Sequence, residues 1–125
     1  MLYRFIQRLL KKSSQTSLIP DETLSSQITE VQSLLTSIDE LMPNDQTSDN
    51  WRKFLHTMHK TLEQKPNKQG LDEANQIWQS IHGGMGSWND YYIPHDDHKT
   101  MVRLNDELEM LCYRLTTSLN GSIDR

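Results

Sequence analysis

Apolar residues recur every three to four positions along most of this chain, with polar residues between them. This spacing gathers the apolar side chains on one face of a helix and leaves the opposite face to solvent. Strict alternation of apolar and polar residues, which would indicate a strand, is brief, and Tyr91-Tyr92-Ile93 is too short to build a sheet. The pattern therefore predicts an all-α protein with helices at about 2–10, 20–42, 51–62, 71–82 and 96 or 97–119.

The longest of these segments carries a heptad-like seam, which Leu34 and Leu41 widen beyond the two positions per heptad of an isolated coiled coil. A wider stripe suits a helical bundle, and at 125 residues the chain has the length of one domain. We therefore expect a bundle of four main helices plus an N-terminal amphipathic helix, all in a single domain. Its parts would be the N-terminal helix (1–12), a linker (13–19) and the bundle (20–119). The seam consists of Leu24, Ile28, Val31, Leu35, Ile38 and Met42.

Residues that start and stop helices stand between the apolar stripes. Pro20 suits the first turn of the long helix, and Pro43-Asn44-Asp45 ends it. Thr47-Ser48-Asp49-Asn50 offers caps for the next helix, 65–70 reads as a loop, and Asn120-Gly121 stops the last helix.

The segment His82–Pro94 separates the last two predicted helices and holds three of the five glycines of the chain. Gly83 can take the left-handed conformation that ends a helix, and Ser87-Trp88-Asn89-Asp90 has the spacing of a capping box. Gly84 and Gly86 would let the backbone press against a helix, so that Met85 and Trp88 enter the core. We therefore predict a structural turn at Gly83, Gly84, Met85, Gly86, Ser87, Trp88, Asn89 and Asp90.

Two other interpretations of this turn remain open. A phosphate-binding loop would need a Lys-Ser/Thr pair and a preceding strand, and neither is present here. A partner-binding surface is the other alternative, because rigid loops with exposed aromatic side chains are common contact sites.

Residues 81–90, Ile-His-Gly-Gly-Met-Gly-Ser-Trp-Asn-Asp, resemble the Gly-Gly-Met-Gly-Ser-aromatic-Asn-Asp motif of a family of small uncharacterised bacterial proteins, a domain of unknown function. The resemblance extends to 50–55 upstream and 104–108 downstream, and covers about residues 35–119. It implies a bacterial cytosolic helical domain without an established activity. Members look like the small single-domain proteins encoded beside toxins, which is an analogy of type.

The composition narrows the choice of compartment. Apolar runs are two or three residues long, so we expect neither a transmembrane helix nor a secretory signal, and we expect a cytoplasmic protein. The single cysteine, Cys112, lies on an apolar stripe and excludes an intramolecular disulfide framework. We expect it to be a buried, inert thiol.

The net charge of −4 hides four blocks of alternating sign. Residues 1–12 carry +4, residues 13–51 carry −7, residues 52–68 carry +4 and the remainder carries −5. Such blocks usually form solvated faces that neutralise one another in the folded protein. The acidic excess disfavours nucleic acid and favours a basic protein as partner.

The sequence offers only weak signals for a catalytic or metal-binding site. His95-Asp96-Asp97-His98 is the densest set of ligands, and His82 or the pair His56 and His59 could complete a zinc site. However, this cluster lies within one turn, and Asp96 and Asp97 are what a helix start prefers. Ser87 lacks a nucleophile elbow, and adjacent acids such as Asp106 and Glu107 point to different helix faces. We therefore predict no enzyme, no catalytic residue, no metal and no cofactor.

These observations favour a protein-binding module, and more specifically an immunity-type protein that occludes a basic toxin. The residues expected to form the partner face are Asp21, Glu30, Asp39, Glu40, Asp45 and Asp49.

Two alternatives stay open: a structural or adaptor homodimer that uses the N-terminal apolar stripe, and a metal-binding enzyme around His95 and His98. The N-terminal stripe also suits a membrane surface, but docking onto the domain or onto a second copy is favoured.

Overall fold

The computed structural model describes residues 18–83 and 86–120, with side chains from Thr23 onward. This part of the chain is helical and contains no strand. The elements are α2 (Leu18–Leu41), α3 (Gln46–Gln64), α4 (Lys68–Ser80), the short 3₁₀ turn η1 (Trp88–Asp90) and α5 (His98–Asn120). The expected helix at 2–10 lies outside the described residues.

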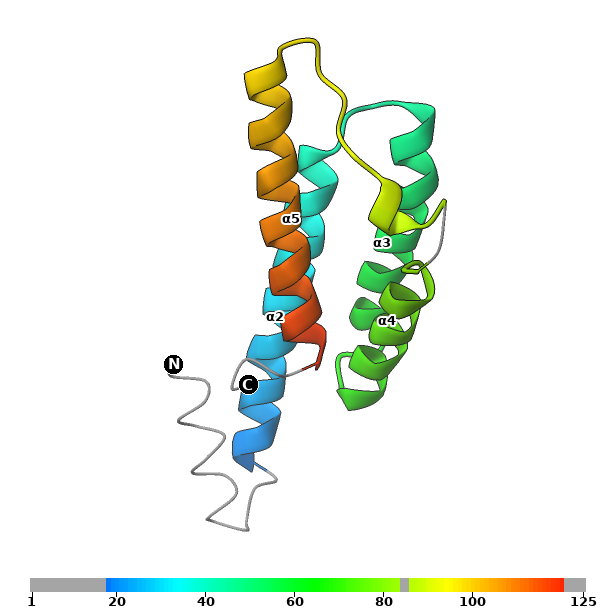
Figure 1. The fold of residues 1–125 in the computed structure, drawn as a ribbon. Coiled ribbons are helices and arrows are strands. Elements are labelled where there is room, and N and C mark those ends of the chain that lie inside the picture. The colour runs from blue at the N-terminus through cyan, green and yellow to red at the C-terminus, as the bar shows by residue number, and fades with distance from the viewer. Residues whose placement is uncertain (1–17, 84–85, 121–125) are drawn as a thin grey trace.

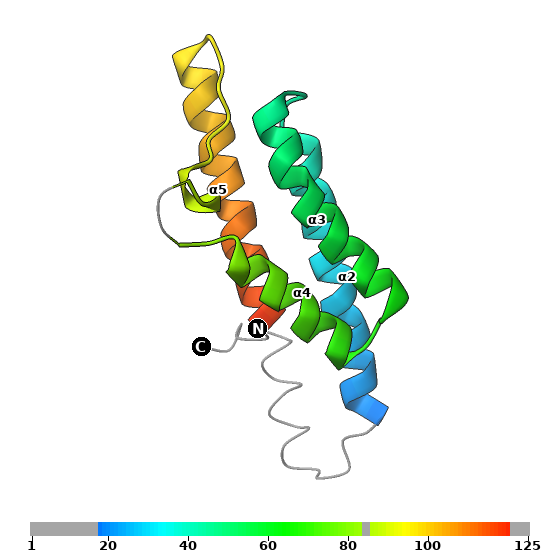
Figure 2. The ribbon, with the colours of Figure 1, turned by 90° about the vertical axis from the view of Figure 1, so that its right-hand side faces the viewer.

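The four helices form an up-down-up-down bundle (Figure 1). α2 packs most extensively against α5, and α3 against α4. The contacts of α2 with α3 and of α4 with α5 close the arrangement, and Figure 2 shows the C-terminal end of α4 approaching α5. Residues 81–97, which include η1, connect the end of α4 to the start of α5.

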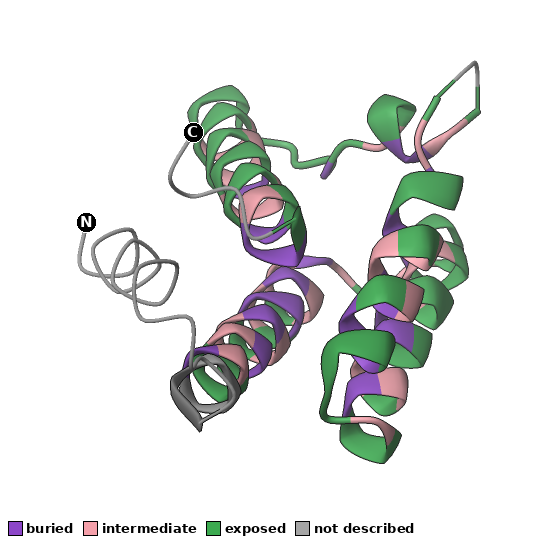
Figure 3. Ribbon diagram, turned by 90° about the horizontal axis from the view of Figure 1, so that it is seen from below, coloured by how far each residue is buried: buried purple, intermediate pink, exposed green. Residues whose placement is uncertain are grey.

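One stripe of each helix faces the interior, as Figure 3 shows. From the predicted seam, Ile28, Val31, Leu35, Ile38 and Met42 are buried and Leu24 is partly buried. Burying a large apolar side chain contributes about 1.5–3 kcal/mol, so these stripes supply the main driving force for folding. The sequence prediction of a four-helix core is confirmed for the described residues.

Several helix boundaries differ from the predicted ones: α2 begins at Leu18, inside the expected linker 13–19, and α4 ends at Ser80. The earlier starts of α3 and α4 have clear causes. α3 begins earlier than expected because Asp45, not a residue of 47–50, is its N-cap. α4 begins at Lys68 because the Asn67 side chain accepts a hydrogen bond from the Gly70 N–H. A Cβ at Gly70 would lie 1.8 Å from the Lys65 carbonyl oxygen, so the tight turn between α3 and α4 needs glycine there.

The start of α5 agrees with the sequence prediction. The Asp97 carboxylate accepts hydrogen bonds from the backbone N–H and the hydroxyl of Thr100 and so caps the helix.

Candidate functional site

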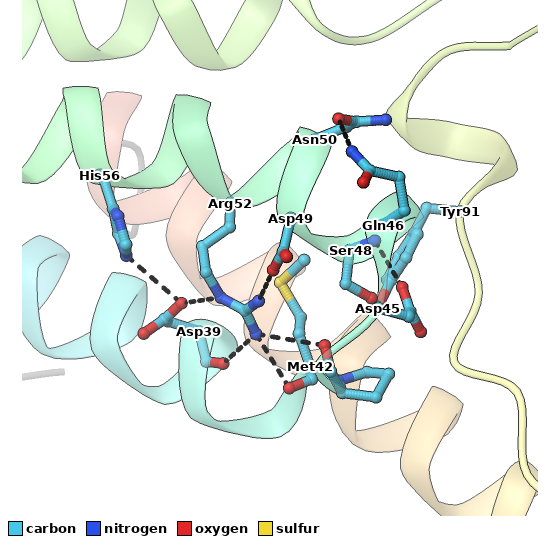
Figure 4. A network of polar contacts seen from close by, with 11 residues as sticks. Asp39, Met42, Asp45, Gln46, Ser48, Asp49, Asn50, Arg52, His56 and Tyr91 are labelled. Carbon is cyan, nitrogen blue, oxygen red and sulfur yellow. Dashed lines mark hydrogen bonds and ion pairs between the residues drawn. The ribbon is translucent and has the colours of Figure 1, made fainter.

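Carboxylates gather where α2 ends and α3 begins (Figure 4). We call this region the acidic corner and define it as Asp39, Glu40, Asp45 and Asp49. These are four of the six residues that the sequence predicted for a partner face. The bend at 42–45 brings them to one end of the bundle.

Arg52 of α3 holds the acidic corner together. Its Nη1 donates to Asp49 Oδ1 at 2.6 Å, and its Nε donates to Asp39 Oδ1. Its Nη2 donates to the backbone carbonyls of Asp39, at 3.1 Å, and Met42, at 2.9 Å, which are free at the C-terminal end of α2. Arg52 thus fixes two carboxylates and ends α2 at the same time.

The side chain of Arg52 is only 14% exposed, so its charge lies beneath the carboxylates. Burial alone would lower the pKa of the guanidinium, but the hydrogen bonds and charges of Asp39 and Asp49 raise that pKa above its ordinary value. The guanidinium therefore stays protonated throughout the physiological pH range.

Asp45, unlike Asp39 and Asp49, caps a helix. Its Oδ1 accepts from the Ser48 N–H at 2.7 Å, which caps α3. The backbone and side-chain hydrogen bonds from Ser48 hold the pKa of Asp45 below its ordinary value. Asp45 is thus a carboxylate whose position and charge are both fixed by the fold.

Glu40 is exposed and forms no ion pair with any described side chain. The four carboxylates of the acidic corner and the guanidinium of Arg52 together carry a formal net charge of −3. His56 lies at its edge, with Nε2 3.4 Å from Asp39 Oδ1. The corner therefore presents ordered negative charge to solvent.

The other two predicted partner-face residues are not part of this cluster. Glu30 lies further back on α2, where it pairs with Arg114 of α5 at 3.0 Å. The side chain of Asp21 lies outside the described part of the chain.

A shallow hollow of about 200 Å³ adjoins the acidic corner between α2 and α3. Asp39 and His56 belong to both features, and Leu55 supplies an apolar floor. An apolar side chain of a partner that also contacts the carboxylates would fit here. The lining residues are Leu35, Thr36, Asp39, Leu55, His56 and His59.

The glycine-aromatic connection (residues 81–97) is organised around Trp88, which is buried. The Trp88 ring stacks on Tyr91 at 5.1 Å between centroids and meets Trp51 and Trp78 at 5.7 and 5.9 Å. The Trp88 N–H also donates to the Ile81 carbonyl at 2.8 Å, which closes the glycine loop. The expected inward position of Trp88 is confirmed.

Two further links hold the connection to the bundle. The hydroxyls of Tyr91 and the fully buried Ser48 share a hydrogen bond of 2.6 Å. The Asn105 amide donates to the Ile93 carbonyl at 2.9 Å and accepts from the Ile93 N–H at 2.8 Å. The connection is therefore anchored on α3, on α5 and at the end of α4.

The predicted structural turn has the expected special residues where the structure describes it. Gly83 and Gly86 have φ of +101° and +76°, a conformation that favours glycine. Ser87 accepts from the Asn89 N–H at 3.3 Å, as expected for a cap. Asp90 differs from the capping-box expectation, because its carboxylate accepts from the Gly86 N–H instead of the Ser87 N–H. Gly84 and Met85 lie outside the described residues.

Around the candidate metal ligands, the structure shows capping contacts. His95 Nδ1 accepts from the Asp97 N–H, while the Asp97 carboxylate is engaged with Thr100, which holds its pKa below the ordinary value. His56 and His59 lie beside the acids Asp39 and Glu63 respectively. Within 18–83 and 86–120, no three His, Cys, Asp or Glu side chains are grouped as metal ligands.

Cys112 is partly buried on α5. Burial raises the pKa of its thiol to about 11, although a contact with the Trp88 side chain acts in the opposite direction. The thiol is therefore almost fully protonated at neutral pH, which agrees with the expected inert role.

Sequence reasoning missed three contact residues of these two regions. In the sequence, Arg52 stands out only as part of a basic block, although its spacing from Asp49 is that of a helical i,i+3 pair. The sequence suggests Ser48 as a helix cap and not as the hydrogen-bond partner of Tyr91. Nothing in the sequence links Asn105 to Ile93. Apart from the Arg52–Asp49 pair within α3, these contacts depend on the packing of one element against another.

None of the described helices is long and apolar enough to cross a membrane.

Similarity to known proteins covers only part of the chain. No curated protein and no solved structure matches the chain. Residues 45–101 match the model of a domain of unknown function (DUF6966). The matched segment contains α3, α4, the glycine-aromatic connection and the first turn of α5, whereas α2 lies outside it. This segment of the chain is thus similar to an uncharacterised domain.

Proposed function

We propose that this chain is a small protein-binding module whose partner carries a basic surface, and that the acidic corner contacts that partner. In its finer form, the proposal is a bacterial immunity-type protein that acts in the cytoplasm by occluding a cognate toxin, without catalysis of its own. The observation that carries the proposal is that Asp39 and Asp49 share Arg52, whose side chain is only 14% exposed, next to the helix-capping Asp45 and the exposed Glu40.

The order of these carboxylates favours binding. A side chain that is already fixed loses little conformational freedom when a partner contacts it. Arg52 fixes Asp39 and Asp49, and the helix cap fixes Asp45. Each carboxylate still has an oxygen for which no hydrogen bond to a described residue is found, so lysine or arginine side chains of a partner can bind there.

Net negative charge at one end of a small bundle also acts at a distance. Complementary charge steers a basic partner during diffusion and speeds association, and this effect weakens as salt increases. The hollow beside Asp39 adds a place for an apolar contact, which carries more binding energy than a charged rim.

The test is a capture experiment with the tagged full chain in the native organism, at low and at high salt. The variant is Glu40→Lys, which reverses an exposed charge of the acidic corner. The matched control is Glu63→Lys at the far end of α3, where the glutamate lies 3.6 Å from His59.

We expect the wild type and Glu63→Lys to retain one stoichiometric basic protein at low salt, and Glu40→Lys to lose most of it. Equal retention by all three chains would contradict the acidic corner as the contact site. Retention of an acidic partner, or of a basic partner that high salt does not release, would contradict the electrostatic mechanism.

A further inference from the structure

The outer face of α5 exposes large apolar side chains. Val102 is 43% exposed, Met110 61% and Tyr113 70%, although the inner face of the same helix buries Leu108 and Leu115. At 100° per residue, Val102, Met110 and Tyr113 share the side of α5 that faces away from the core. Single exposed apolar residues are ordinary, but three on one face of one helix form a candidate contact surface.

The charged residues at this face are sorted by sign along the helix. Lys99 and Arg103 lie in the N-terminal half of α5, and Asp106, Glu107 and Glu109 follow them toward the C-terminus. All five side chains are exposed, and none forms an ion pair with a described side chain. We call these five charged residues, together with the three apolar ones, the outer strip. The outer strip thus has a basic half followed by an acidic half.

A strip with this order of charge is complementary to a second copy of itself that runs in the opposite direction. In an antiparallel pair of α5 helices, the basic half of each copy lies against the acidic half of the other, whereas a parallel pair would place like charges together. A two-fold axis near residue 105 sets Arg103 opposite Glu107 of the second copy and places Lys99 within one helical turn of Glu109 of the second copy. Opposite charges therefore meet on both sides of the axis.

The apolar residues fit the same arrangement. With the axis near residue 105, Val102 lies within one helical turn of Met110 of the second copy. Tyr113 lies within one turn of Lys99 of the second copy, where its ring can cover the aliphatic stem of the lysine. Antiparallel α5 helices therefore bury the exposed apolar side chains and pair the charges at the same time.

We propose that two copies of this chain associate through their outer strips, with the α5 helices antiparallel. Arg114 does not compete for the acids of the second copy, because it is paired with Glu30 of its own molecule at 3.0 Å. The strip is one helix wide and about 21 Å long from Lys99 to Tyr113, so the contact is smaller than the roughly 1,600 Å² of a standard interface and the dimer is expected to be weak. The inference is independent of the proposed function, because the outer strip and the acidic corner share no residue.

Sedimentation equilibrium of the full chain, at concentrations from about 5 to about 500 µM, tests the dimer. The variants are Arg103→Glu, Glu107→Arg and the double variant with both changes. Each single variant places like charges opposite each other across the two-fold axis, whereas the double variant restores an opposite pair in reverse and keeps the net charge of the wild type. Both positions are exposed, so the bundle should stay folded, as circular dichroism would verify.

We expect the wild-type mass to rise from 14.7 kDa toward twice that value, with a dissociation constant on the order of 100 µM. Each single variant should weaken the dimer about tenfold, because the two-fold axis repeats the altered pair. The double variant should return to within about threefold of the wild type. Because the two single changes shift the net charge in opposite directions, a general charge effect would not weaken the dimer in both.

The apolar part of the contact is tested in the same way. The double variant Met110→Gln and Tyr113→Gln removes apolar surface without a change of charge, and we expect it to weaken the dimer at least about tenfold. The matched control is Tyr92→Gln, because Tyr92 is also 61% exposed but lies in the glycine-aromatic connection. This control should associate like the wild type.

Each other outcome overturns the proposal. A monomer at every concentration would show that the outer strip does not bind a second copy. A dimer that none of the outer-strip variants weakens would lie on another surface, and its loss in Ile6→Lys would assign it to the N-terminal apolar stripe. A charge-exchanged double variant as weak as the single variants would exclude the antiparallel arrangement.

Discussion

The glycine-aromatic connection and the acidic corner are both irregular segments between helices, yet they are built in opposite ways. The connection directs Trp88 inward and binds to the bundle through neutral hydrogen bonds to Ser48 and Asn105. At the acidic corner, the side chain of Arg52 is only 14% exposed, whereas those of Asp39 and Asp49 are 32% and 58% exposed. The first arrangement stabilises the fold, whereas the second is the surface that we propose to contact a partner.

The most distinctive stretch of the sequence is not the one that we propose as the binding site. The glycine and aromatic residues form the most unusual stretch of the chain, and their described contacts are with the core. The acidic residues look ordinary in the sequence, but the fold joins Asp39 and Asp49 through Arg52 (Figure 4). Changes in the connection should therefore alter stability, and changes in the corner should alter binding.

The largest effect is expected for Trp88→Ala, because Trp88 contacts three other aromatic rings in the core. Truncation of a buried tryptophan leaves a cavity and costs about 3–5 kcal/mol of unfolding free energy. Urea unfolding followed by circular dichroism measures this loss. The control Tyr92→Ala, at an exposed position, should change the unfolding free energy by less than about 0.5 kcal/mol. A Trp88→Ala variant as stable as that control would contradict the inward role of the connection.

The next effect is expected for Arg52→Met, which keeps the apolar stem but removes every charged hydrogen bond of the guanidinium. Hydrogen bonds to charged groups contribute about 1.5–3 kcal/mol, and Asp39 and Asp49 would repel each other without the arginine. Lys68→Met is the matched control, because its pair with Asp72 is exposed and should contribute less than about 0.5 kcal/mol. Equal losses in the two variants, measured by urea unfolding, would show that Arg52 forms only a surface pair.

A smaller effect is expected for Tyr91→Phe, which leaves the hydroxyl of the fully buried Ser48 without its partner. An unsatisfied buried hydroxyl costs about 1–3 kcal/mol. The double variant with Ser48→Ala should be less destabilised than the sum of the two single variants, because it removes both hydroxyls. Additive losses in this double-mutant cycle would show that the two hydroxyls do not interact.

The smallest effect concerns the dependence of stability on pH. The pKa of Asp45 is held below its ordinary value of 3.8, so its contribution is present above that pH and is lost as the pH falls through the lowered pKa. Asn in its place still accepts from Ser48 but does not titrate. Asp45→Asn should therefore lose less stability than the wild type between neutral pH and about pH 2, as thermal unfolding at several pH values would show. Equal acid sensitivity would assign the pH dependence to other carboxylates.

The sequence predicted the helices well because their apolar stripes are local and periodic. Ile28, Val31, Leu35 and Ile38 are buried as the seam required, and Trp88 lies in the core as the glycines around it suggested. The helix at 2–10 stays a prediction, since it lies outside the described residues.

The details that the sequence did not predict depend on contacts between distant elements. Residues 44–50 contain six residues that can cap a helix, and the choice of Asp45 goes together with the burial of Ser48 against Tyr91, 43 positions away. Likewise, the acidic block of 13–51 suggested one continuous face, but Glu30 pairs with α5 while Asp39 and Asp49 share Arg52. Local patterns contain no information on the pairings that join different helices.

The central claim is that the acidic corner binds a partner and the connection does not. Its most direct test is the association rate of the captured partner as a function of ionic strength, for the wild type, Glu40→Lys and Tyr92→Ala. We predict a rate that falls steeply with salt for the wild type and Tyr92→Ala, and a rate roughly three- to tenfold lower at low salt for Glu40→Lys. A wild-type rate insensitive to salt, or a loss in Tyr92→Ala with none in Glu40→Lys, would contradict the claim.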